Sequence, residues 1–152
     1  MPTRLRPCGN REAGVPNYHP ELPPGCPPND AAPMTGTVFR RTKKPPTTIT
    51  NQDFHSSREL GDQAPGSECQ RWGTSVWVDM ADVLRDLENF AAYLPKYRIV
   101  AFDVTPDHGV IKHTPTNDRP HHHTFWRDAT IDFSEICTIV YSPVAAEMPD
   151  AI

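Results

Sequence analysis

The chain has 152 residues, and its 15 Lys and Arg against 19 Asp and Glu give a formal net charge of -4 at pH 7. A general nucleic-acid coat protein needs an excess of basic residues to displace counterions from phosphates, so this composition argues against that class. No stretch is long and apolar enough to span a bilayer, and residues 1–10 lack the apolar run of a signal peptide. We therefore expect a cytoplasmic protein with no membrane contact.

Proline divides the chain into parts of different character. Twelve of the 18 prolines precede Gly66, where apolar residues are sparse and backbone donors are missing. The composition predicts a Pro-rich irregular arm over residues 1–36, a compact domain over 37–142 and a C-terminal tail over 143–152. Polyproline-like segments also bind partners, so the arm is a candidate segment for a protein–protein contact.

The elements follow in chain order from the pattern of apolar residues. A β-rich run at 37–41 predicts a first strand, Phe54 is a candidate core anchor, and 74–78 predicts a second strand with Trp77 in the core. Asp79 can cap a helix over 80–94, which Pro95 ends. Further strands are expected at 98–104, 109–113, 122–126 and 136–141. This order predicts an α+β fold with a small, mainly antiparallel sheet, one principal helix and an extended Pro-rich N-terminal arm.

The four cysteines are widely scattered and form no CxxC pair: Cys8, Cys26, Cys69 and Cys137. Neither a zinc knuckle nor a disulfide scaffold has this spacing, so we expect free thiols.

Five of the seven histidines crowd into residues 108–123. The polar loop 115–120 is expected to form a hairpin tip that brings His113 and His121 to face each other, while strand alternation puts His121 and His123 on one face and His122 on the other. Imidazole titrates near neutral pH, so His113, His121 and His123 are candidate acid/base residues.

Cationic and aromatic side chains beside these histidines suggest an anionic substrate. Lys112, Arg119 and Arg127 are candidate holders of a phosphate, Trp126 is a candidate stacking residue, and Arg40 begins a basic patch. The leading hypothesis is a small enzyme or toxin-like effector that acts on a nucleotide or nucleic-acid phosphate. Its acid/base chemistry needs neither a metal nor another cofactor.

A second pattern runs through three of the expected strands. Arg40 lies on the first, Ser75 on the second, and Glu135 at the start of a late one. This order resembles the arginine, serine, glutamate order of one ADP-ribosyltransferase class, and the resemblance implies that Arg40 holds a nicotinamide dinucleotide and Glu135 its ribose. The sequence departs from that family in its Gly-Thr-Ser-Val-Trp context, where the family has Ser-Thr-Ser, and in having no second glutamate before Glu135.

Two further alternatives belong to other classes. A metal site would need three or four converging ligands, for which His108 and His113, one of His121 or His123, and an aspartate are available, although their spacing matches no metal motif. A non-catalytic immunity or adaptor module would bind a partner through the Pro-rich arm. The histidines would then form only a polar hairpin tip.

Overall fold

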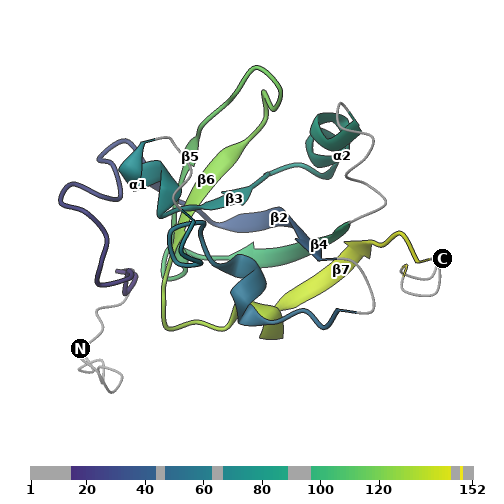
Figure 1. Cartoon of the computed structure of the whole chain (residues 1–152), viewed down its shortest axis with the longest axis horizontal. Helices are drawn as coiled ribbons and strands as arrows, with labels where there is room; N and C mark the ends of the chain where they lie inside the picture. The colour runs from purple at the N-terminus through teal and green to yellow at the C-terminus, as the bar shows by residue number, and fades with distance from the viewer. Residues whose placement is uncertain (1–14, 44–46, 63–66, 89–96, 145–147, 149–152) are drawn as a thin grey trace, which may run out of the picture.

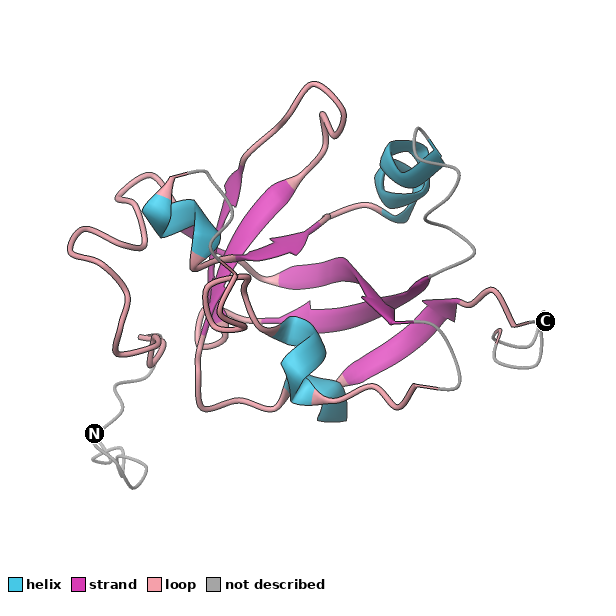
Figure 2. Ribbon diagram, viewed as in Figure 1, coloured by secondary structure: helices cyan, strands magenta, loops and turns pink. Residues whose placement is uncertain are grey.

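The computed structural model describes residues 15–43, 47–62, 67–88, 97–144 and 148. In these residues the fold is mixed α+β, with seven strands in two antiparallel sheets and one main helix (Figures 1 and 2), which confirms the predicted fold class. The elements in chain order are β1 (Ala32–Pro33), β2 (Gly36–Lys43), η1 (Asn51–Phe54), α1 (Glu68–Arg71), β3 (Thr74–Val76), α2 (Met80–Glu88), β4 (Tyr97–Val104), β5 (Gly109–His113), β6 (His123–Arg127), η3 (Phe133–Glu135) and β7 (Cys137–Tyr141).

The strands divide between a four-stranded sheet of order β1-β5-β6-β3 and a three-stranded sheet of order β2-β4-β7. The two sheets meet where β2 and β3 lie side by side near the centre of the molecule (Figure 1). There Phe39 and Trp77 exchange two backbone hydrogen bonds of 2.8 and 2.9 Å. This junction between the sheets is where the candidate site lies.

Two apolar clusters hold these layers together. The larger one contains Phe54, Phe102, Phe125 and Phe133, and the rings of Phe54 and Phe102 meet edge to face with centroids 5.3 Å apart. The smaller one contains Trp77, which is completely buried. The predicted core positions of Phe54 and Trp77 are both confirmed.

Helix α2 covers the smaller cluster. Asp79 caps its first turn, since one carboxylate oxygen accepts from the backbone N–H groups of Ala81 at 2.8 Å and Asp82 at 3.3 Å, which confirms the predicted cap. Val83 and Leu87, one turn apart, are its buried apolar residues. The helix was expected to reach residue 94, but residues 89–96 lie outside the described part. None of the helices in the described ranges has the length and apolar composition that a membrane span requires.

Residues 15–35, which the sequence assigns to the arm, contact the four-stranded sheet. Ala129 donates its backbone N–H to Asn17 at 2.7 Å, and β1 pairs with β5. Cys26 and Cys69 form a disulfide, with their Cα atoms 5.4 Å apart, that ties this segment to α1. The expectation of free thiols is therefore wrong for this pair, because the fold brings together two cysteines 43 positions apart in the sequence. Cys137 is free, and Cys8 lies outside the described residues.

Replacing both Cys26 and Cys69 with serine should lower the free energy of unfolding by about 2–4 kcal/mol, because the crosslink restricts the unfolded chain. Urea denaturation measures this change. The matched control is Cys137→Ser, which removes a thiol but no crosslink and should cost much less. Equal stability of the double variant and the wild type would contradict the disulfide.

Candidate functional site

A cleft of about 760 Å³ opens at the junction of the two sheets. Its floor comes from β2, β3 and β6, and its walls from the segment 55–62, the residues around α1, and the hairpin loop 114–122. This volume lies within the roughly 300–1,000 Å³ of typical small-molecule sites.

The cleft is rich in guanidinium groups. Four arginines line it, against two aspartates, so it carries a net positive charge when its histidines are neutral: Arg40, Arg41, Arg71 and Arg119 with Asp62 and Asp118. Arginine presents a planar set of donors that matches the oxygens of carboxylates and phosphates. An anionic ligand therefore fits this cleft.

Arg40 lies in the floor of the cleft and hydrogen-bonds to η1 and β3. Its Nε donates to the carbonyl oxygen of Asp53 at 2.6 Å, and its Nη1 donates to the carbonyl oxygen of Ser75 at 2.7 Å. Burial, helped by the nearby charge of Arg41, lowers the pKa of Arg40 to about 10. The group keeps its charge at neutral pH and lies against β3, the strand that carries Ser75.

His122 and Ser75 form a hydrogen-bonded pair in the cleft. The Nε2 atom of His122 lies 2.8 Å from the Ser75 hydroxyl, and its Nδ1 lies 3.1 Å from the carbonyl oxygen of Thr114. Nδ1 also lies 2.9 Å from the Thr114 hydroxyl; in the tautomer that donates from Nδ1 to Thr114, Nε2 accepts the proton of the Ser75 hydroxyl. A serine, a base and a third group that orients the base are the parts of an activated hydroxyl.

Burial lowers the pKa of His122 to about 4, and the hydrogen bond to Thr114 opposes this shift only in part. The charges of Arg119, His123 and Arg41 lower it further. His122 is therefore a neutral hydrogen-bonding group at physiological pH. Arg119 and Arg41 also lie close enough to His122 to influence its titration, so the histidine and the arginines share one electrostatic environment.

The hairpin loop over the cleft is fixed at its base by His121. Its Nδ1 lies 2.9 Å from one carboxylate oxygen of Asp86, and the other oxygen accepts from the Trp77 indole at 2.9 Å. Asp86 is completely buried, and burial alone would raise its pKa, but the hydrogen bonds from His121 and Trp77 outweigh that effect and lower it. The loop that carries Arg119 and His122 is thus held to the smaller core cluster through Asp86.

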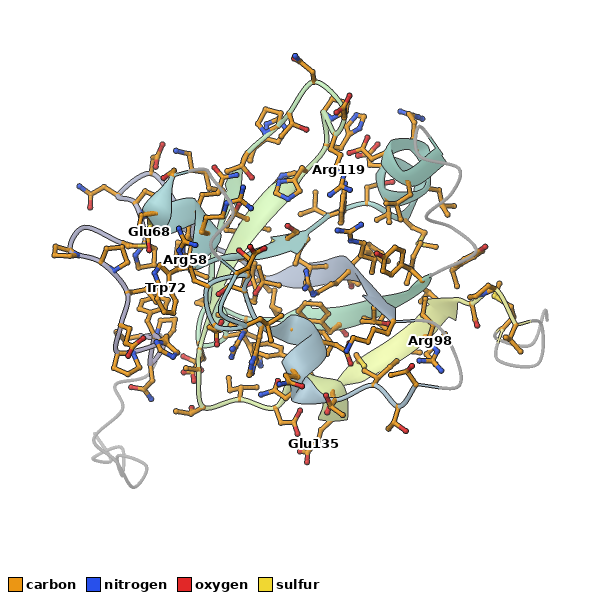
Figure 3. The ribbon with its side chains drawn as sticks, in the orientation of Figure 1. Arg58, Glu68, Trp72, Arg98, Arg119 and Glu135 are labelled. Carbon is orange, nitrogen blue, oxygen red and sulfur yellow. A yellow bond between two sulfur atoms is a disulfide. The ribbon has the colours of Figure 1, made fainter. Side chains whose placement is uncertain are left out.

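The wall near α1 is held by a surface ion pair. Arg58 donates from Nε and Nη2 to the two carboxylate oxygens of Glu68, at 3.0 and 2.8 Å, and Trp72 donates to the same carboxylate at 3.2 Å. The three side chains lie together beside α1 in Figure 3. These three side chains join the segment 55–62 to α1. Other residues of that segment and of α1 line the cleft.

The predicted acid/base histidines lie elsewhere on the hairpin. His113 pairs in register with His123, and their ring centroids are 4.9 Å apart. The expectation that His113 faces His121 is therefore wrong by two positions, because β6 begins only at His123 and His121 turns toward α2. Among the described residues, those that line the cleft include His122 and His55 but not His113, His121 or His123. The catalytic role of these three stays a prediction.

The predicted substrate-binding residues divide in the same way. Arg40 and Arg119 line the cleft, whereas Lys112 pairs with Asp30 at 2.9 Å on the surface. Arg127 is buried in an ion pair with Glu59, and the Trp126 indole donates to the Cys69 carbonyl oxygen at 2.9 Å. Their roles in binding stay predictions.

The three residues of the transferase-like order lie in two different places. Arg40 and Ser75 lie next to each other in the cleft. Glu135 is exposed in η3 and lies at the edge of the molecule far from Arg119 (Figure 3). The titratable group beside Ser75 is instead His122.

The metal alternative has no support from side-chain placement. In the described ranges, no three His, Cys, Asp or Glu side chains lie where they could hold a metal ion. His108, one of the proposed ligands, has its Nδ1 2.7 Å from the backbone nitrogen of Thr105.

Several cleft residues, His122 among them, were not singled out from the sequence as site residues. His55 follows η1 directly, and Arg71 ends α1; both reach the cleft only through tertiary packing. No protein-family model, curated protein or solved structure matches this chain. What the cleft does is therefore inferred from its own residues.

His122 should make the protein less stable as pH falls. The unfolded chain binds a proton near pH 6.5, whereas the folded chain keeps His122 neutral down to about pH 4, so the unfolding free energy should fall by up to about 3 kcal/mol across that interval. Urea denaturation at several pH values, compared between the wild type and His122→Gln, isolates this contribution.

The variant His113→Gln, which changes an exposed histidine of the same hairpin, is the control and should keep the wild-type slope. An identical pH dependence in His122→Gln and the wild type would show that His122 is not buried in its neutral form.

Proposed function

We propose that this protein is an enzyme that binds a nucleotide by its phosphates in the arginine-lined cleft. The observation that carries the proposal is the joining of four arginines with the neutral His122–Ser75 pair in one cleft of about 760 Å³. Guanidinium groups neutralise phosphate charge, while a histidine and a hydroxyl hold the ribose hydroxyls or a reacting oxygen.

The preferred substrate is a dinucleotide such as NAD. The resemblance to the ADP-ribosyltransferase class implies that Arg40 holds the dinucleotide, and Ser75 is its neighbour here, 2.7 Å from Nη1 to the carbonyl oxygen. Glu135 is remote from the cleft, so we assign the ribose-holding role to the Ser75 hydroxyl, which lies 2.8 Å from Nε2 of the neutral His122.

The reaction would be cleavage of the bond between nicotinamide and its ribose. The nicotinamide nitrogen leaves with the electron pair of that bond, and a nucleophile, either water or an acceptor group, forms the new bond to the ribose carbon and releases its proton to the solvent. The arginines hold the pyrophosphate. The His122–Ser75 pair, held in a fixed position beside the ribose, stabilises the positive charge that develops on the ribose.

A second candidate is phosphodiester cleavage by histidine acid/base chemistry. Two histidines, His55 and His122, line the same cleft as the arginines. Burial and the charge of Arg127 lower the pKa of His55, which favours its neutral, proton-accepting form. This candidate keeps the chemistry expected from the sequence but moves it to different histidines.

The expected protein partner stays a proposal, whereas the expected location is revised. A protein partner would contact the Pro-rich segment, part of which is fastened by the Cys26–Cys69 disulfide. A disulfide persists most readily in an oxidising compartment, so it argues against the expected cytoplasmic location.

Arg119→Gln should weaken binding of NAD or ADP-ribose by at least about 10-fold, because a hydrogen bond to a charged group contributes about 1.5–3 kcal/mol. Isothermal titration calorimetry measures the affinity. Lys112→Gln, which removes one positive charge from the same hairpin outside the cleft, is the matched control and should bind as the wild type does.

An assay of nicotinamide release, run beside an RNA-cleavage assay, separates the two candidates. NAD turnover that is lost in Ser75→Ala supports the dinucleotide enzyme. RNA cleavage lost in His55→Ala and His122→Ala supports the second candidate. Activity that disappears in the His121→Ala/His123→Ala double variant but survives in Ser75→Ala would move the site to the outer hairpin and contradict the cleft.

A further inference from the structure

A second, smaller cavity of about 220 Å³ adjoins the cleft at the end of β2. Arg40, Arg41 and Leu60 line both spaces, so the two are neighbours across these side chains. The smaller space lies below the roughly 300 Å³ at which sites for drug-sized ligands begin, so it suits a group smaller than a whole nucleotide.

The smaller cavity also has an excess of positive charge. Arg40, Arg41 and Lys43 line it, against the single carboxylate of Asp53, which accepts a hydrogen bond from the backbone N–H of Thr50 at 2.9 Å. The Arg41 guanidinium lies over the ring of Tyr97, 4.9 Å from its centroid, and this contact restrains its direction.

Strand β2 is fixed where it forms this cavity. Arg98 donates from Nη1 to the carbonyl oxygens of Lys43 at 3.0 Å and Thr47 at 2.6 Å. Arg98 lies at this end of the sheets, away from Arg119 in Figure 3. The cationic side chains of the cavity thus project from an anchored strand end.

Thr42 gives the cavity an unusual buried group. Its side chain is 3% exposed and lines the cavity, yet its hydroxyl makes no hydrogen bond with any described residue. Buried hydroxyl groups in folded proteins almost always have a partner, because leaving one without a partner is costly. A ligand oxygen in the cavity would supply that partner.

We propose that the smaller cavity binds the phosphomonoester group of a second substrate, beside the nucleotide in the cleft. Arg41 and Lys43 neutralise the phosphate, and the Thr42 hydroxyl donates to one of its oxygens. The role as a second substrate site rests on the proposed function, in which the cleft holds the nucleotide. Arg40 lies between the two ligands and belongs to both sites.

The test is titration of the full chain with inorganic phosphate, followed by the shifts of backbone amide signals in NMR spectra. Thr42→Val should raise the dissociation constant by at least about 10-fold, because it removes a donor to a charged group and keeps the side-chain shape. Thr42→Val should also unfold at the same or a higher temperature, since the lost hydroxyl had no partner in the protein.

The matched control is Thr37→Val, on the same strand, whose hydroxyl donates to Asp103 at 2.6 Å away from both cavities; it should bind phosphate as the wild type does. A 5′-phosphorylated oligonucleotide that binds more tightly than free phosphate and than its 5′-hydroxyl form would assign the site to a nucleic-acid end. Equal binding of free phosphate and the phosphorylated oligonucleotide would assign it to a small phosphorylated acceptor.

The proposal is overturned if phosphate produces no saturable shifts, if Thr42→Val binds it like the wild type, or if ADP-ribose displaces it competitively. ADP-ribose binding is measured separately on the same samples. Failure of ADP-ribose to bind, with phosphate binding still dependent on Thr42, would remove the proposed nucleotide enzyme and leave the phosphate site in place.

Discussion

The guanidinium group of Arg40 connects the two sheets of this fold beside the cleft. It extends from β2 in one sheet and donates to the Ser75 carbonyl oxygen of β3 in the other, while its second donor reaches the loop at Asp53. A partly buried charge is tolerated only when its hydrogen bonds are satisfied. The fold therefore keeps the carbonyl oxygens of β3 and η1 within reach of this guanidinium group. The cleft opens beside the Phe39–Trp77 bridge, and Arg40 and Ser75 both line it.

The side chains that could take part in a reaction are arranged around the contact between Arg40 and β3. The contact between Arg40 and β3 holds Ser75 at the cleft. His122 reaches Ser75 because His121 fastens the hairpin loop to buried Asp86. The same arrangement keeps His122 neutral, since burial and the neighbouring guanidinium groups both oppose its protonation. Cationic groups and neutral hydrogen-bonding groups are thereby supplied by different residues in one cleft, and the proposed nucleotide site uses both.

The sequence predicts the local elements better than their assembly. The Asp79 cap, the start of α2 and the strands follow from spacing and propensity. The core positions of Phe54 and Trp77 follow from their apolar character. The Cys26–Cys69 disulfide and the convergence of His55 and Arg71 on the cleft depend on contacts between distant segments, which composition does not encode. The catalytic role predicted for His113, His121 and His123 stays a prediction, while the contact of His122 with the cleft depends on the fold of the hairpin loop, which the local pattern of histidines does not specify.

A crystal structure of the protein with ADP-ribose would show whether the arginine-lined cleft holds the phosphates of a nucleotide. We expect the pyrophosphate within hydrogen-bonding distance of at least two of the cleft arginines, with the ribose against the His122–Ser75 pair. Density for ADP-ribose at the outer hairpin around His113 and His123, or an empty cleft at a saturating ligand concentration, would contradict it.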